Sequence, residues 1–178
     1  RLVGLSHWVD FRLGNALAMP FEAAAFDVVI GQEAWAHVPD KQQLIAECAR
    51  VVRPGGRIAF TDIVRGQELT EAEEDRLRRE MTFLELASAG SYARLLEAAD
   101  CTVVESVDLG AAWTEILRQR LEMYRGLQDT TVERFGEAHF RRWDDTYAFF
   151  VALYGAGRLS GVRIVAERQA SRKRSSSA

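Results

Sequence analysis

The sequence has few cysteines and histidines and no long apolar run, and each of these features excludes a class of protein. Its 178 residues include two cysteines, three histidines and three prolines. Cys48 and Cys101 cannot build a disulfide framework, so we expect reduced, buried thiols and a cytoplasmic protein. No Cys/His spacing typical of zinc is present, so no metal site is predicted. No apolar run approaches the roughly 18 residues that a membrane span requires, so no membrane partner is expected.

Excess positive charge is also missing. Lysine and arginine number 23 against 26 aspartates and glutamates, which gives a formal net charge of −3. This balance offers no basic surface for nucleic acid. The basic cluster RKR lies in a serine-rich end, and we expect residues 169–178 to be a disordered, solvated tail. The remaining residues 1–168 have the length of one packed domain.

The most informative stretch is residues 11–62, which has the pattern of a βαβ unit. An apolar run at 26–30 predicts a buried parallel strand, and it ends at Gln32 and Glu33. A helix is predicted from Lys41, with the Pro-Gly-Gly of 54–56 as its stop. Asp40 is its expected N-cap, and the Gln43 side chain is expected to answer in a variant of the capping box. A second strand follows at 57–62. Ligands bind at strand ends in open α/β sheets, so the loop carrying Gln32, Glu33 and His37 is the candidate site. Residue types alone support a purely structural role for this loop equally well.

Periodic patterns predict the other elements of the chain. Alternation at 9–13 predicts a half-buried strand, and Thr70 with Glu73 forms a capping box that opens a long helix ending at 89–90. A shorter helix capped by Ser91, a strand at 101–107, helices at 111–127 and 137–154 and a strand at 162–166 follow. The aromatic residues of the last two helices either fill the core or cover the site; they include Trp113, Tyr124, Phe140, Trp143, Tyr147 and Tyr154.

Five segments carry information that periodicity does not. They are GNALAMPF at 14–21, FDVV at 26–29, QEAW at 32–35, HVPDK at 37–41 and RPGGR at 53–57. In this order and spacing they resemble the class I S-adenosylmethionine-dependent methyltransferases. The run Gln-Glu-Ala-aromatic-x-His and the helical C-terminal half resemble the sarcosine/dimethylglycine N-methyltransferases of glycine betaine synthesis. Methyltransferases of quinones, sterols and phosphoethanolamine share much of the pattern, so these acceptors stay open.

The resemblance implies an α/β fold with a Rossmann-like sheet and a helical C-terminal cap. Residues 9–62 would form half of the cofactor site, and residues 70–157 the cap, with the strand at 101–107 between its helices. The implied reaction is transfer of a methyl group from S-adenosylmethionine to a small amine. An in-line displacement at the sulfonium methyl depends on alignment more than on a base, so no catalytic residue is predicted.

The resemblance also implies a role for each residue of the candidate site. Asn15 and Ala16, with Leu17, would lie beside the adenine of the cofactor. Gln32 would lie beside its methionine part. Glu33 and His37 would border the cofactor and the acceptor amine, with His37 as a positioning group.

One departure from the family weakens the functional prediction. The glycine-rich first motif, acidic-x-Gly-x-Gly-x-Gly, is absent, and so is the acidic residue that binds the ribose. Together with a start at Arg1 and no initiator methionine, this predicts a C-terminal fragment with an incomplete cofactor site and an exposed inner sheet edge. A third interpretation is therefore a catalytically inactive domain that serves as a binding or assembly module. The sequence predicts neither the acceptor nor the oligomeric state.

Overall fold

The computed structural model describes residues 4–5 and 7–170, so most of the predicted tail lies outside the described residues. Its elements are β1 (Phe26–Gln32), the 3-10 turn η1 (Trp35–His37), α1 (Lys41–Val51), β2 (Val52–Arg65), α2 (Glu71–Met81), α3 (Ala89–Ala98), β3 (Cys101–Asp108), α4 (Gly110–Gly126), α5 (Gln128–Phe135), α6 (Glu137–Gly155) and β4 (Leu159–Arg168). Strands and helices alternate through the first half, and helices dominate the second.

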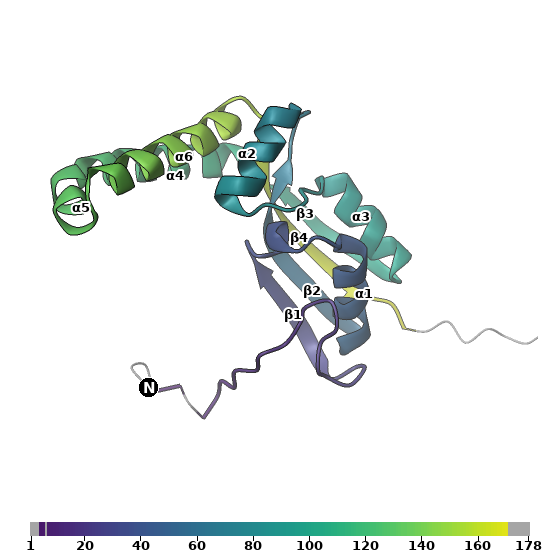
Figure 1. The fold of residues 1–178 in the computed structure, drawn as a ribbon. Helices are drawn as coiled ribbons and strands as arrows, with labels where there is room; N and C mark the ends of the chain where they lie inside the picture. The colour runs from purple at the N-terminus through teal and green to yellow at the C-terminus, as the bar shows by residue number, and fades with distance from the viewer. Residues whose placement is uncertain (1–3, 6, 171–178) are drawn as a thin grey trace, which may run out of the picture.

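The described strands form one open, mixed sheet in the order β1-β2-β4-β3 (Figure 1). β1 and β2 run parallel, with Ile30 opposite Ala59, and β4 runs antiparallel to both of its neighbours, β2 and β3. This arrangement confirms the predicted α/β, Rossmann-like fold class. Because β1 and β2 are parallel, their carboxyl ends meet at the same edge of the sheet.

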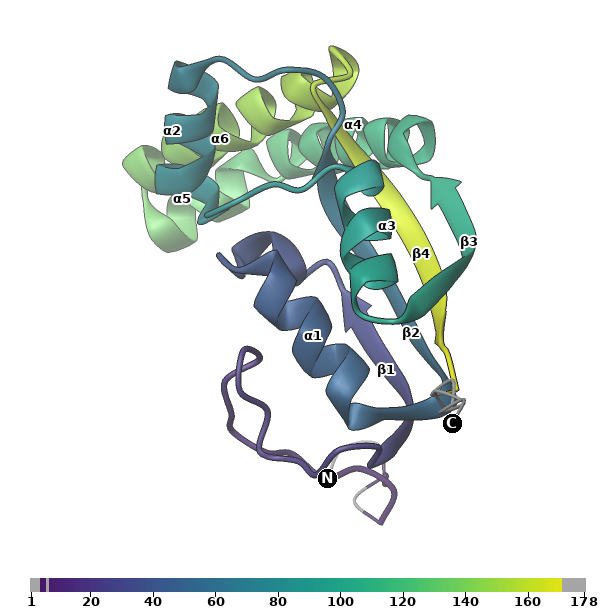
Figure 2. The ribbon, with the colours of Figure 1, turned by 90° about the vertical axis from the view of Figure 1, so that its right-hand side faces the viewer.

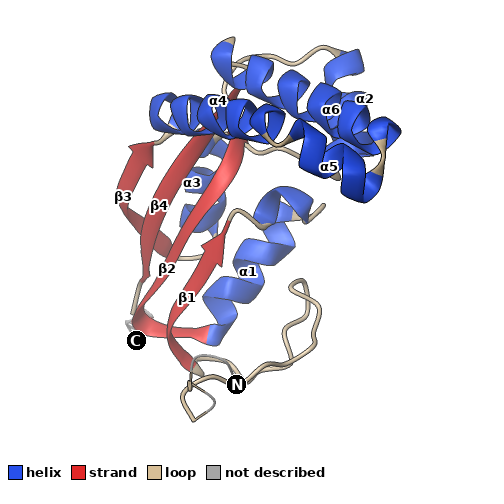
Figure 3. Ribbon diagram, turned by 90° about the vertical axis from the view of Figure 1, so that its left-hand side faces the viewer, coloured by secondary structure: helices blue, strands red, loops and turns tan. Residues whose placement is uncertain are grey.

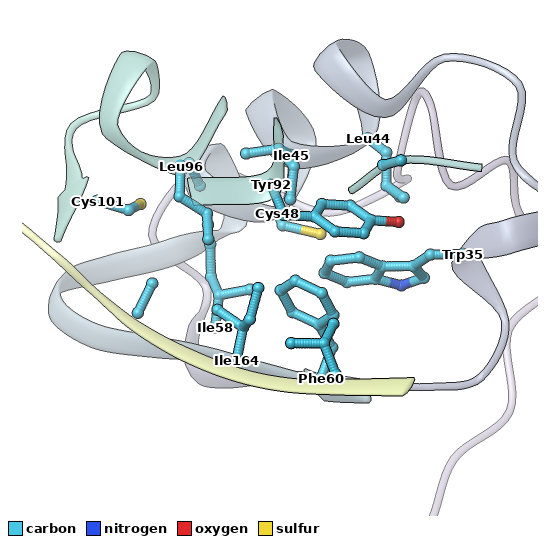
Figure 4. Packing of buried hydrophobic residues seen from close by; sticks show 14 of the residues in the cluster. Trp35, Leu44, Ile45, Cys48, Ile58, Phe60, Tyr92, Leu96, Cys101 and Ile164 are labelled. Atoms are coloured by element: carbon cyan, nitrogen blue, oxygen red, sulfur yellow. The ribbon is translucent and has the colours of Figure 1, made fainter. Parts of the chain in front are cut away.

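Two helices, α1 and α3, cover one face of the sheet (Figure 2). Their apolar stripes and the inward residues of β2 and β4 form the main core, which Figure 4 shows with Tyr92 and Cys48 facing Phe60 and Ile58. Cys48 and Cys101 are free and buried in this core, as predicted. Burial raises the pKa of the Cys48 thiol to about 12, so Cys48 is no nucleophile at neutral pH.

The other helices form a layer across the end of the sheet to which β1 and β2 point (Figure 3). Helices α2, α4 and α6 supply a second core, centred on Leu77, Phe83, Phe150 and Leu153. The predicted helical cap is therefore present, with β3 preceding most of it in the chain. The capping box of Thr70 and Glu73 opens α2 as predicted.

Two predicted elements are wrong. Residues 9–13 form no strand, and the side chains of Phe11 and Leu13 are 90% and 102% exposed. Alternating side chains suit a strand, but a strand also needs a neighbouring strand to pair with. Among the described residues β1 pairs only with β2, so residues 9–13 do not pair with it. The long helix after Thr70 ends at Met81, because Thr82 adopts a left-handed conformation with φ of 59°. Ser88, not Ser91, is the N-cap of the next helix.

Two further details of the predicted βαβ unit also need correction. β1 is not buried: Val28 and Ile30, on the face away from the core, are 46% and 78% exposed. Asp40 caps α1 by accepting from the Gln43 N–H at 2.8 Å, but the Gln43 side chain does not close a capping box. It donates instead to the Leu17 carbonyl at 3.0 Å and so holds a distant loop.

Candidate functional site

A pocket of about 400 Å³ lies where β1 and β2 meet the helical layer. The loop after β1 supplies one wall, and helices α4 and α6 supply the opposite one. Its lining residues are Glu33, His37, Ile63, Met81, Phe83, Trp113, Ile116, Leu117, Arg120, Tyr147, Phe150 and Tyr154. The pocket therefore has a mainly apolar and aromatic wall with a few polar groups, as small-molecule sites do.

Glu33 enters this pocket because the chain turns sharply at the end of β1. Its φ is +50°, a left-handed conformation that costs a non-glycine residue about 1–3 kcal/mol. The Glu33 N–H donates to the Thr61 carbonyl at 2.8 Å, which extends the pairing of β1 with β2 by one residue. Gln32 is the last residue of β1, is exposed, and does not line the pocket.

His37 reaches the pocket from the end of the 3-10 turn that follows. Its Nδ1 lies 3.0 Å from the Thr82 carbonyl oxygen, and its ring packs against Phe83 at a centroid distance of 5.2 Å. A carbonyl only accepts, so Nδ1 carries the proton of this hydrogen bond. In the neutral imidazole, Nε2 is then a free acceptor.

The turn that carries His37 is fixed by Asp62, a residue that the sequence analysis did not assign to the site. Asp62 is fully buried near the end of β2. Its Oδ1 accepts from the Ala36 N–H at 3.1 Å, and its Oδ2 accepts from the Tyr92 hydroxyl at 2.7 Å. Burial raises the pKa of Asp62, and these two hydrogen bonds oppose that shift. Asp62 follows the apolar residues 58–60 of β2, and this charged residue was the sequence feature that could have indicated its role.

Aromatic packing supports the same turn from the other side. The Trp35 ring stacks on Phe60 with centroids 4.0 Å apart. The Trp35 indole passes over Gly31, where an added Cβ would lie 2.5 Å from Nε1. Glycine is therefore the residue that lets the turn fold back onto the sheet.

The aromatic residues of the cap divide between core and pocket. Trp113, Tyr147 and Tyr154 line the pocket, whereas Phe140 is buried and stacks on Tyr124 at 5.1 Å. Gly161 makes room for Trp113, because a Cβ there would lie 2.3 Å from the ring. Tyr154 does both, since it lines the pocket and is buried in the second core.

Asn15, Ala16 and Leu17 lie in a separate loop beside α1 and do not line the pocket. The Asn15 side-chain oxygen accepts from the Leu17 N–H at 2.9 Å and closes a tight turn. The loop is held to α1 through Glu47, whose Oε2 accepts from the Met19 N–H at 2.7 Å. Arg50 donates to the Met19 and Phe21 carbonyls and to Glu47.

Of the six predicted site residues, the structure brings Glu33 and His37 together in one pocket. The other four lie outside it, in the loop beside α1 and at the end of β1. Within the described ranges, no group of three or more His, Cys, Asp and Glu side chains could hold a metal ion. None of the described helices has the length and apolar character needed to cross a membrane.

The chain is similar to proteins named as methyltransferases. Residues 1–60 match a family model described as a methyltransferase domain. The methyltransferase GfsG of Streptomyces halstedii is 35% identical over 112 residues, which is 61% of this chain and 40% of the relative. Other relatives are named as tocopherol, glycine/sarcosine/dimethylglycine and phosphoethanolamine methyltransferases. The chain spans 38–50% of the length of the first relatives it matches.

Solved structures share the fold at low sequence identity. A candidate sarcosine dimethylglycine methyltransferase from Galdieria sulphuraria superposes with a TM-score of 0.83 at 20% identity, covering 94% of this chain and 62% of that one. The Haemonchus contortus phosphoethanolamine N-methyltransferase 2, in complex with S-adenosylhomocysteine, gives 0.77 at 16% identity over 88% and 36%. These likenesses confirm the fold.

Proposed function

We propose that this chain is part of a class I S-adenosylmethionine-dependent methyltransferase and serves methyl transfer to a small-molecule acceptor bound in the pocket, as the methyltransferase-domain match over residues 1–60 and the shared fold support. The observation that carries the proposal is the position of Glu33 and His37. The two side chains line one pocket at the carboxyl ends of parallel strands, where α/β folds bind their ligands.

S-adenosylmethionine would supply the activated methyl group. We assign Asn15, Ala16 and Leu17 to its adenine end and Gln32 to its methionine end. The fit is supported by the closed turn at Asn15, which exposes Asn15 and Ala16 on a loop fastened to α1. The ribose contact is the part for which the sequence holds no glycine-rich motif.

The pocket residues would align the acceptor and keep water away from it. Glu33 makes no ion pair among the 14 found in the described chain, so its carboxylate is available to a hydroxyl or amine of the acceptor. His37 would accept a second hydrogen bond through Nε2. The aromatic wall from α4 and α6 excludes water, which strengthens both interactions.

Pocket size bears on the choice of acceptor. Sarcosine or dimethylglycine, the acceptors suggested by the sequence motifs, would find a carboxylate and aromatic faces suited to a methylated ammonium. A volume of about 400 Å³ is nevertheless in the range of sites for much larger ligands. The geometry therefore favours the quinone or sterol type of acceptor, and sarcosine or dimethylglycine is the second candidate.

The test is transfer of tritium from S-adenosyl-[methyl-³H]methionine by the protein expressed from its complete gene. The acceptors offered are sarcosine, dimethylglycine, phosphoethanolamine and an alkylated hydroquinone. We expect the hydroquinone to be labelled, and Glu33→Gln to lower kcat/KM about 10- to 100-fold, because the acceptor would lose a hydrogen bond to a charged group worth about 1.5–3 kcal/mol.

The matched control is Glu97→Gln, which alters an exposed glutamate on α3 and should leave the rate unchanged. Labelling of sarcosine or dimethylglycine alone would favour the second candidate. Failure to label any acceptor, with the cofactor bound, would favour a binding or assembly module.

A further inference from the structure

A second hollow adjoins the pocket, further out along the helical layer. This outer hollow has a volume of about 200 Å³ and is lined by Arg120, Met123, Tyr124, Trp143 and Tyr147. Arg120 and Tyr147 also line the inner pocket. The two hollows are therefore neighbours that share one wall.

Helical spacing shows that both hollows belong to one groove. On α4, Trp113, Ile116, Arg120 and Met123 follow one another at intervals of three or four residues, so they share a face. On α6, the residues Trp143, Tyr147, Phe150 and Tyr154 do the same. At about 1.5 Å per residue, the ten steps from Trp113 to Met123 span about 15 Å along α4.

The two helices lie antiparallel and hold the groove open over this length. Tyr124 stacks on Phe140, and the Arg125 guanidinium donates to Asp144 at 2.6 Å. These contacts join the far end of α4 to the start of α6. The inner end of the groove is closed by β2 and the loop after β1.

The outer part of the groove exposes apolar side chains. Met123 is 62% exposed and Trp143 is 41% exposed. Covering such side chains removes apolar surface from water, which is favourable. Arg120 and Tyr147 lie side by side where the two hollows meet. Arg120 makes no ion pair with any carboxylate in the described residues.

We propose that the groove binds one elongated, mainly apolar acceptor. Its methyl-accepting group would lie at Glu33 and His37, and its hydrocarbon tail would pass Arg120 and Tyr147 to reach Met123 and Trp143. This inference rests on the proposed function for the inner end and adds the substrate class. The outer hollow adjoins the inner pocket and shares Arg120 and Tyr147 with it, which favours the tail of a ligand held in the inner pocket over a second copy of the chain as occupant.

The probe is a series of n-alkyl 4-hydroxybenzoates, from the methyl to the octyl ester, titrated into the 178-residue chain without cofactor. Isothermal titration calorimetry gives the dissociation constant of each ester. We expect the constant to fall about three- to fourfold for each added methylene, and to keep falling through the longer esters.

Trp143→Ala should remove part of this gain from the long esters, weakening octyl binding about tenfold, and leave the methyl ester unchanged. The matched control is Trp8→Ala, which alters a tryptophan that is 85% exposed and outside the groove. Met123→Lys is a second variant with the same expected pattern, and the thermal midpoint of each variant verifies that it folds.

A dissociation constant that does not change with ester length would overturn the proposal, as would full retention of the gain in both groove variants. Dimerisation of the chain that Met123→Lys abolishes would also overturn it, because the groove would then be an interface. None of these measurements depends on turnover or on S-adenosylmethionine. A failed methyl-transfer assay is therefore distinguishable from a failed substrate-class inference.

Discussion

At the scale of single residues, the candidate site depends on the carboxylate of Asp62, which does not line the pocket. Asp62 is fully buried and binds the backbone of the turn before His37 and the hydroxyl of Tyr92. A buried carboxylate is costly unless its oxygens are hydrogen-bonded. Tyr92, itself buried on α3, therefore links the core to the loop that forms the site.

Tyr92→Phe should destabilise the chain by about 2 kcal/mol at pH 7, the usual contribution of a hydrogen bond to a charged group. Burial raises the pKa of Asp62 in the folded state above its unfolded value. The protonated form of Asp62 therefore favours folding below the unfolded pKa, and this contribution is lost as pH rises through the folded pKa. The destabilisation by Tyr92→Phe should accordingly shrink on acidification, because a neutral carboxyl needs the hydroxyl donor less.

Urea unfolding followed by circular dichroism at several pH values measures this effect. Tyr124→Phe is the matched control, since the Tyr124 hydroxyl makes only a long hydrogen bond of 3.4 Å to the Phe140 carbonyl. Equal losses in the two variants would contradict the role assigned to Asp62.

At the scale of the elements, local rules predicted how helices begin better than how they end. Asp40 and Thr70 cap their helices as expected, because an N-cap bond involves residues only three positions apart. Helix α2 ends with Thr82 as its C-cap and not with a glycine, the residue that usually marks a helix end. Thr82 adopts a left-handed conformation there, and threonine has no local preference for that conformation. Residues 9–13 show the same limit for strands, because pairing depends on a partner elsewhere in the chain.

The same distinction applies to the site. The rule that ligands bind at strand ends identified Glu33 and His37 within one short segment. The opposite wall comes from α4 and α6, more than a hundred residues further along for Tyr147 and Phe150. Periodicity grouped those aromatic residues on helix faces, but only packing decides which face meets the sheet.

The contact between α1 and the predicted adenine loop gives a testable case at this scale. Glu47 accepts hydrogen bonds from Arg50 and from the Met19 N–H, and these lower its pKa, the Arg50 side chain most. Glu47→Gln should cost about 1 kcal/mol at pH 7, less than a fully buried charged hydrogen bond because Arg50 is partly exposed.

The pH dependence of this variant follows from the sign of the shift. A lowered carboxyl pKa adds stability above the unfolded pKa, and that stability is lost as pH falls through the folded value. The difference between wild type and Glu47→Gln should therefore vanish in acid, as measured by urea midpoints. Glu97→Gln, which alters an exposed glutamate on α3, is the control and should show no such difference. If the difference in stability between wild type and Glu47→Gln persisted in acid, the destabilisation would come from packing and not from the charge of Glu47.

At the scale of the whole molecule, the sheet ends at a strand whose outer face is apolar and exposed. Phe26, Val28 and Ile30 alternate on that face, and within the described part of the chain β1 has a single pairing partner. The segments assigned to the cofactor are the loop of Asn15 beside α1 and the end of β1 at Gln32. They would hold the adenine end and the methionine end of S-adenosylmethionine, and no residue is assigned to the ribose between them.

We therefore expect the 178-residue chain alone to bind S-adenosylmethionine far more weakly than the micromolar range. Isothermal titration calorimetry with millimolar cofactor measures this directly, and cooperative urea unfolding of the same sample shows that the chain is folded. A micromolar dissociation constant for the chain alone would contradict the prediction, and the loops at Asn15 and Gln32 would then suffice to hold the cofactor without a ribose-binding motif.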